Sequence, residues 1–172
     1  MQRVAMGLVV VLLDASYNGW DVLADPVGWA LVLAGVLPVA EQLGGRVTMT
    51  AVLAFVTSLV VYPPVVARTV DPSVGWALSL PHLAFVVVLC LALAALLPEL
   101  ERRFRSTAVV LVVVAVAPVV VLAGGGGVLA VGAVAFVAVI TQLYVVYLLF
   151  RVSPLVPGDT SRAAPERERP ST

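Results

Sequence analysis

Four side chains with oxygen ligands lie close together near the N-terminus of the sequence, namely Asp14, Asn18, Asp21 and Asp25. The first three are spaced i, i+4 and i+7, so they share one face if a helix continues through them. Clustered carboxylates in an apolar environment are suited to proton relay or to cation binding, and an amide oxygen suits a hard cation such as Ca²⁺ or Mg²⁺. The alternative is a solvated loop whose acids only cap the neighbouring helices.

A single histidine is the other candidate for chemistry. His82 lies ten residues after Pro72, which is about 15 Å along a helix that begins there. We expect a neutral ring that hydrogen-bonds to a neighbouring helix, with proton handling as the alternative. Asp71 completes the candidate ion- or solute-binding set, although its exposed pair with Arg68 would contribute little energy. Hydrogen bonds across helices are also expected for Thr50, Thr57, Thr141 and Gln142.

The sequence lacks the motifs of common catalytic and metal sites. It has no H-E-x-x-H, no G-x-S-x-G and no Walker phosphate loop, and Cys90 is its one cysteine. Ser79 lies three residues before His82, but no acid is spaced to orient the ring of such a dyad. We therefore predict no enzyme activity, no cofactor and no metal site. Ten arginines balanced by ten acids argue against binding to nucleic acid.

The composition indicates what kind of fold must position these residues. Of the 172 residues, 62% are hydrophobic and 12% are charged, and the mean hydropathy is +1.11. Soluble domains are about 45–50% apolar and about 25% charged. The apolar runs do not alternate with polar residues, as the strands of a membrane barrel would. The sequence therefore predicts an all-α protein, a polytopic transmembrane helical bundle.

Four stretches are long enough to cross a membrane, which takes about 20 apolar residues. The last long run, from Ser106 to Phe150, has no charged residue and is divided by four glycines at 124–127, which suit a tight turn. The predicted spans are Val47–Ala67, Pro72–Pro98, Thr107–Ala123 and Val128–Phe150.

The N-terminal region has two shorter apolar stretches, Val4–Leu13 and Pro26–Ala40. If the first helix extends through Tyr17 and the second to Leu43, the protein has six spans. The three resulting hairpins cover residues 3–43, 47–98 and 106–150. A re-entrant first hairpin is an alternative, and so is a secretory signal peptide cleaved at Ala15.

The arginines predict the orientation, because Lys and Arg concentrate in cytoplasmic loops. With six spans and a cytoplasmic N-terminus, nine of the ten arginines lie inside and Arg68 lies outside. All glutamates fall inside, whereas the aspartates before the tail fall outside. We therefore expect a multi-pass protein of the cell membrane with both termini in the cytoplasm. Residues 151–172 contain four prolines and mixed charges, which predict a disordered cytoplasmic tail.

A short repeat marks two of the predicted helix starts. The run Asp-Pro-Val-Gly-Trp-Ala-Leu at 25–31 recurs at 71–78 with one inserted residue. Asp is a good N-cap, Pro fits the first helical position, Trp anchors a helix at the membrane interface, and Gly permits close helix packing. The predicted caps and anchors are Asp25, Pro26, Trp29, Asp71, Pro72 and Trp76. Because transporters often contain internal repeats, the duplication also favours a transport role.

The segment from Asn18 to Trp29 resembles a motif of small uncharacterised bacterial polytopic membrane proteins. That motif reads Asn-Gly-aromatic-Asp-Ile-Leu-Pro-Asp-x-x-Gly-aromatic, and this sequence reads Asn-Gly-Trp-Asp-Val-Leu-Ala-Asp-Pro-Val-Gly-Trp. The match covers these twelve residues, and Ala24 stands where the family has proline. The resemblance implies a location in a bacterial inner membrane and draws attention to Asp21 and Asp25, but it implies no assigned activity.

Two functions are consistent with these observations. One is a small transporter or permeation protein whose aspartates form an outward-facing acidic vestibule, as a homo-oligomer because six short helices enclose little volume. The other is a non-catalytic accessory or scaffold protein that binds another membrane protein through its helix faces. Close packing in that case would use small residues such as Ala115, Ala117 and Ala123. In both cases the lipid bilayer surrounds the bundle.

Overall fold

The computed structural model describes residues 1–13, 16–17, 20–21, 25–62, 72–125 and 127–156, and nearly all of these are helical. The α-helices are α1 (Gln2–Leu12), α2 (Asp25–Val36), α3 (Ala40–Leu43), α4 (Gly45–Val61), α6 (Pro72–Leu96), α7 (Glu101–Ala123) and α8 (Val128–Val152). There are also two 3₁₀ turns in the described residues. η1 (Leu37–Val39) joins α2 to α3, and η2 (Pro98–Leu100) precedes α7. The all-α class predicted from the composition is confirmed.

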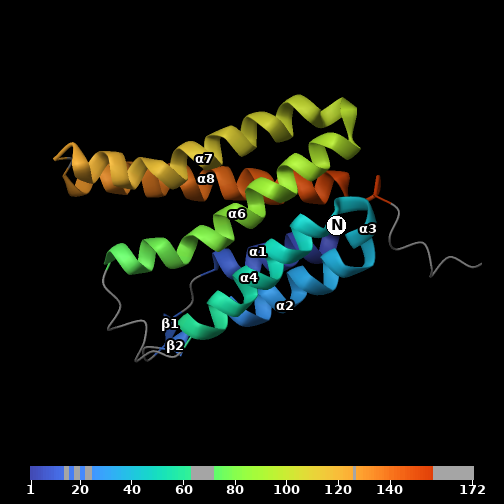
Figure 1. Cartoon of the computed structure of the whole chain (residues 1–172), viewed down its shortest axis with the longest axis horizontal. Helices are drawn as coiled ribbons and strands as arrows, with labels where there is room; N and C mark the ends of the chain where they lie inside the picture. The colour runs from blue at the N-terminus through green and yellow to red at the C-terminus, as the bar shows by residue number, and fades with distance from the viewer. Residues whose placement is uncertain (14–15, 18–19, 22–24, 63–71, 126, 157–172) are drawn as a thin grey trace, which may run out of the picture.

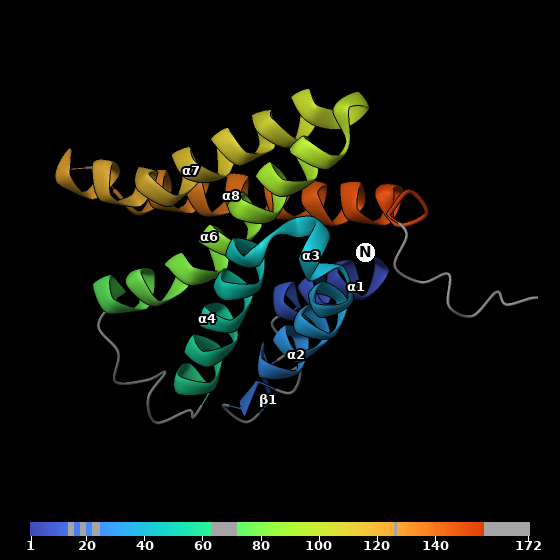
Figure 2. The same cartoon turned by 45° about the vertical axis from the view of Figure 1, so that its right-hand side comes forward.

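Successive long helices run antiparallel between the same two ends of the bundle (Figure 1). Both views place α6 between the α7–α8 pair and a group formed by α1, α2 and α4 (Figures 1 and 2). Contacts between α1 and α8 also join these two groups. The N-terminus and the last turn of α8 lie at the same end of the bundle.

Four helical runs are long and apolar enough to cross a membrane, which is consistent with a membrane protein. They are Asp25–Leu43, Val74–Leu96, Pro98–Val121 and Gly132–Val152. All four coincide with predicted spans, since the first, formed by α2, η1 and α3, matches the second N-terminal helix extended to Leu43.

Two of the six predicted spans are short in the structure. The predicted Val47–Ala67 span corresponds to α4, which has 17 residues. α1 has 11 residues and rises about 16 Å, roughly half of a hydrocarbon core about 30 Å thick. The structure therefore confirms a helical bundle with several membrane-length helices, but it does not confirm six spans.

The first helix also ends earlier than predicted. α1 ends at Leu12 rather than Tyr17, and Ser16–Tyr17 (β1) pairs with Trp20–Asp21 (β2) as a two-stranded antiparallel ribbon. Strand pairing joins Tyr17 to Trp20 across this ribbon. The shared helical face of Asp14, Asn18 and Asp21 required a helix that continues through Asp21, and Asp21 lies in β2 instead, whereas Asp14 and Asn18 lie outside the described residues.

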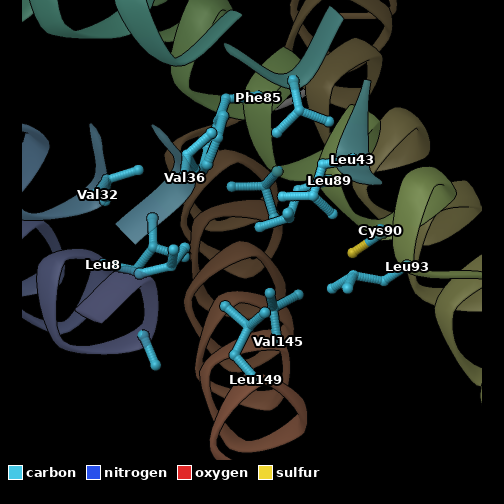
Figure 3. Close-up of a cluster of buried hydrophobic side chains, with 14 of the residues drawn as sticks. Leu8, Val32, Val36, Leu43, Phe85, Leu89, Cys90, Leu93, Val145 and Leu149 are labelled. Carbon is cyan, nitrogen blue, oxygen red and sulfur yellow. The ribbon is translucent and has the colours of Figure 1, made fainter. Parts of the chain in front are cut away.

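The hydrophobic core lies in the half of the bundle nearer the N-terminus. Figure 3 shows Leu8, Val36, Leu89 and Leu149 meeting there from α1, α2, α6 and α8. In α6 the fully buried side chains begin at Phe85, and in α8 they begin at Val145. The buried residues Val152 and Val156 continue this core past residue 150, so the bundle extends beyond the predicted boundary.

The closest helix contact joins α1 to α2. A Cβ atom on Gly7 would lie 2.5 Å from the carbonyl oxygen of Gly28, and one on Gly35 would lie 2.7 Å from Val4 Cγ2. Two backbones approach this closely only where side chains are absent. Gly28 thus permits close packing as predicted, whereas its counterpart in the repeat, Gly75, is exposed.

The charged residues of the described chain are sorted between the two ends of the bundle. We call one end the arginine end because the described arginines lie in the first turns of α1 and α4, in the first two turns of α7 and in the last turn of α8: Arg3, Arg46, Arg102, Arg103, Arg105 and Arg151. The other end, where α2 and α6 begin, is called the aspartate end because α2 begins with Asp25. Described glutamates, such as Glu41 and Glu99, lie at the arginine end.

Candidate functional site

The two copies of the repeat open two helices at the aspartate end. α2 begins at Asp25 and α6 begins at Pro72, so each copy starts a helix as predicted. Trp29 from the first copy and Trp76 from the second line a single cavity. The duplicated segments therefore form two walls of this cavity, which the sequence alone did not reveal.

The cavity has a volume of about 480 Å³. Small-molecule sites in proteins are typically about 300–1,000 Å³ and mostly apolar. The lining includes Leu12, Asp25, Val61 and Gly75, which lie at the ends of α1, α2, α4 and α6. The cavity therefore reaches the aspartate end, whereas the hydrophobic core fills the bundle toward the arginine end.

A hydrogen-bonded pair lies at the inner limit of the cavity. His82 Nε2 lies 3.1 Å from Gln142 Oε1, which joins α6 to α8. An amide oxygen can only accept a hydrogen bond, so Nε2–H of the ring donates to it, and in the neutral ring Nδ1 is then the acceptor nitrogen. The predicted hydrogen bond between a histidine and a neighbouring helix is confirmed, as is the cross-helix role of Gln142.

Trp29 of α2 also packs against the ring of His82. The indole packs edge-on against His82, with ring centroids 5.4 Å apart, and against Phe85 at 5.2 Å. Only 2% of Trp29 is exposed, so the prediction that it anchors α2 at the membrane surface is wrong. Gly28 brings α2 close to α1, and the side chain of Trp29, the next residue, then packs against α6.

Trp76 is half-buried and joins two helices. Its indole Nε1 donates to the carbonyl oxygen of Ala115 in α7 at 3.2 Å. Pro118, three residues further along α7, lacks the N–H of an ordinary helical residue and also lines the cavity. The bond from Trp76 therefore ties α6 to α7 beside a proline.

The hydroxyl groups of the cavity wall bond to their own helices. Thr57, Ser58 and Ser79 donate to carbonyl oxygens three or four residues earlier, at 2.7–2.9 Å. Each oxygen keeps lone pairs that can accept a hydrogen bond from a ligand. Thr50 and Thr141 also bond within their own helix, so cross-helix bonding is wrong for all three predicted threonines.

One charged side chain lines the described part of this cavity, the carboxyl group of Asp25. The remaining lining is largely apolar, with Leu83 and Val114 near the histidine. The described residues contain no cluster of three or more His, Cys, Asp or Glu side chains that could hold a metal ion. The described wall therefore combines one carboxyl group and several hydroxyl oxygens with aromatic and aliphatic surface.

The structure brings together two of the predicted site residues, Asp25 and His82. The backbone of Asp21 lies in β2, and Asp14, Asn18 and Asp71 lie outside the described residues. For Ser79 the sequence favoured an ordinary hydrogen bond to the backbone over a nucleophilic role, and the hydroxyl does donate to the carbonyl oxygen of Trp76, but its place in a cavity wall was not predicted. The helical spacing of Gly75, Ser79 and His82, at i, i+4 and i+7, was a signal that they share one face.

Replacing Gln142 with leucine is expected to destabilise the bundle by about 1–2 kcal/mol, because the buried ring N–H of His82 loses its acceptor. The melting temperature of the purified protein in detergent should fall by about 2–8 °C. Thr141→Val is the matched control, because that hydroxyl bonds only to its own helix, and its melting temperature should stay near wild type. Equal melting temperatures for Gln142→Leu and Thr141→Val would show that the pair does not stabilise the fold.

Comparison of the chain with protein-family models, with curated proteins and with solved structures gives no match. Function is therefore argued from the cavity, from the charge at its wall and from the sorting of charges between the two ends. The resemblance of residues 18–29 to a bacterial membrane-protein motif stays a prediction.

Proposed function

We propose that this protein is a small transporter of the cell membrane that moves a solute through the cavity at its aspartate end. The observation that carries the proposal is the cavity itself, whose largely apolar wall includes Asp25 and the hydrogen-bonded His82–Gln142 pair. Polar groups inside a membrane bundle are costly and usually mark a solute or ion pathway.

The sorting of charges supports an orientation for this transporter. Because Arg concentrates on the cytoplasmic side of membrane proteins, the arginine end faces the cytoplasm and the aspartate end faces outward. Both ends of the chain then lie in the cytoplasm, and the cavity receives solute from outside.

Movement across the membrane needs a second state, because the hydrophobic core fills the inner half of the bundle. Two prolines lie inside the helices beside the cavity, Pro81 in α6 and Pro118 in α7. Proline removes a helical hydrogen bond and allows the helix to bend at that point. Bending there would separate α6 from α8 at the His82–Gln142 pair and open the path to the arginine end.

The direct test is uptake by proteoliposomes that contain only the purified protein. Vesicles are incubated with a mixture of small cationic, neutral and anionic solutes, and the trapped contents are identified by mass spectrometry. At least one solute should enter faster than into protein-free vesicles. If no solute enters faster, the transport proposal fails.

The alternative is an accessory protein that binds another membrane protein. It is favoured by the outer half of α8, where Leu129 and Phe136 are 90% and 67% exposed. This function predicts no uptake in the vesicle experiment and stable co-purification of one partner from native membranes. Replacing Leu129 and Phe136 with alanine should release that partner.

A further inference from the structure

We propose that the arginine end carries a binding site for one anionic phospholipid on the outer face of α7. The phosphate group of the lipid lies beside Arg102, and one acyl chain follows a line of exposed valines along the helix. This inference is independent of the transport proposal, because none of these residues belongs to the described lining of the cavity at the aspartate end.

The headgroup site is an open hollow of about 440 Å³ where η2 passes into α7. In this hollow Glu101 is already paired with Arg105, whose Nη2 lies 3.0 Å from the carboxylate Oε1. Arg102 is exposed and has no ion-pair partner among the described residues. Within the described lining, one positive charge is therefore left uncompensated. The lining residues are Pro98, Glu101, Arg102, Arg105, Ser106 and Val109.

The chemistry of Arg102 favours a phosphate that carries a net negative charge. A guanidinium group holds its N–H donors in a planar fork that can bind two phosphate oxygens at once. Basic side chains at a membrane surface attract anionic lipids. A zwitterionic headgroup brings a cation of its own, which an uncompensated arginine repels. The hollow therefore favours an anionic headgroup over a zwitterionic one.

A line of exposed valines continues from this hollow along α7, which lies on the outside of the bundle (Figure 1). Counted from Arg102, positions i+4, i+7, i+11, i+14 and i+18 share one helical face. These positions hold Ser106, Val109, Val113, Val116 and Val120, and the four valines are 52–64% exposed. From Val109 to Val120 the helix rises about 16 Å, roughly half of a hydrocarbon core about 30 Å thick. The line is thus as long as the acyl region of one leaflet.

The depth of the hollow in a membrane also suits a lipid. The membrane-length run Pro98–Val121 begins at η2, so Arg102 lies in the first turns of this span, at the level of the headgroups. A free phosphate ion would use the hollow alone, whereas a phospholipid uses both the hollow and the valines that follow it. The arrangement of charge followed by apolar surface therefore matches the lipid.

The test titrates the purified full chain in detergent with three probes, and native mass spectrometry measures what binds. Phosphatidylglycerol has an anionic headgroup and acyl chains, phosphatidylcholine has acyl chains and a zwitterionic headgroup, and glycerol 3-phosphate has the phosphate without chains. The first phosphatidylglycerol should bind at least tenfold more tightly than either of the other probes. Equal binding of phosphatidylcholine or of glycerol 3-phosphate overturns the inference.

The contribution of Arg102 is tested with a pair of matched variants. Arg102→Gln should weaken phosphatidylglycerol binding at least tenfold. Arg103→Gln removes the same charge from the next residue, which is exposed but lies about 100° around the helix from the line of valines, and its affinity should stay within twofold of wild type. Equal affinities for the two variants overturn the inference. If Arg102→Gln does not fold, the comparison of the three probes on the wild-type protein decides.

Discussion

Replacing Ala138 with tryptophan is expected to abolish solute uptake in proteoliposomes. Ala138 lies on α8 one turn before Gln142 and lines the cavity. An indole at this position adds a large ring to the cavity wall one turn from Gln142, so it takes up space that a ligand would need beside the His82–Gln142 pair. The initial rate of uptake should fall at least a hundredfold, to the level of protein-free vesicles.

Ala133→Trp is the matched control for this experiment. Ala133 lies on the same helix but is exposed and does not line the cavity, so its tryptophan should project into lipid and leave uptake within twofold of wild type. Melting temperatures of both variants establish that the bundle is intact. Uptake that persists in a folded Ala138→Trp protein would place the solute path somewhere other than this cavity.

The largest effect on stability is expected from Gly7→Leu. A Cβ atom on Gly7 would lie 2.5 Å from the backbone oxygen of Gly28 and 2.8 Å from the backbone nitrogen of Val32. Backbone atoms cannot rotate away, so α1 must move off α2. Overpacking of this kind costs about 3 kcal/mol, which lowers the melting temperature by about 6–12 °C for a chain of this length.

Gly132→Leu serves as the control for the glycine contact. Gly132 lies in the exposed part of α8, and a Cβ atom there would meet nothing within 4 Å. Its melting temperature should equal or exceed that of wild type, because glycine disfavours a helix. If the melting temperature of Gly7→Leu equals that of Gly132→Leu, the close α1–α2 contact does not hold the first two helices together.

The sequence was sufficient to predict the features that depend on local composition. The apolar runs predicted an all-α bundle, and the glycines at 124–127 predicted the break between α7 and α8, where Gly125 has a positive φ of 74°. Proline at position 72 predicted the start of α6. These features depend on the hydrophobicity and the backbone preferences of the residues themselves, which can be read from the sequence.

Features that depend on packing could not be predicted from residue types. Tryptophan is a residue type that often anchors a helix at the membrane interface. Trp29 instead points into the core, because the close contact of Gly28 with α1 brings this part of α2 into the bundle. The cavity is formed by six helices distant in sequence, so no spacing within one helix revealed its volume. The length of α1 also differed from the prediction, because β1 and β2 pair where a continuation of this helix through Tyr17 was expected.

The central claim is that water and solute reach the cavity from the aspartate end. Ser58 tests it best, because it lines the cavity from α4 although only 9% of it is exposed. In intact cells, Ser58→Cys should react with a membrane-impermeant methanethiosulfonate added outside, and the wild-type protein should not, because Cys90 is fully buried in the core. In inverted vesicles, where the reagent meets the arginine end, Ser58→Cys should stay unmodified. No reaction from outside, or faster reaction in inverted vesicles, would contradict the account.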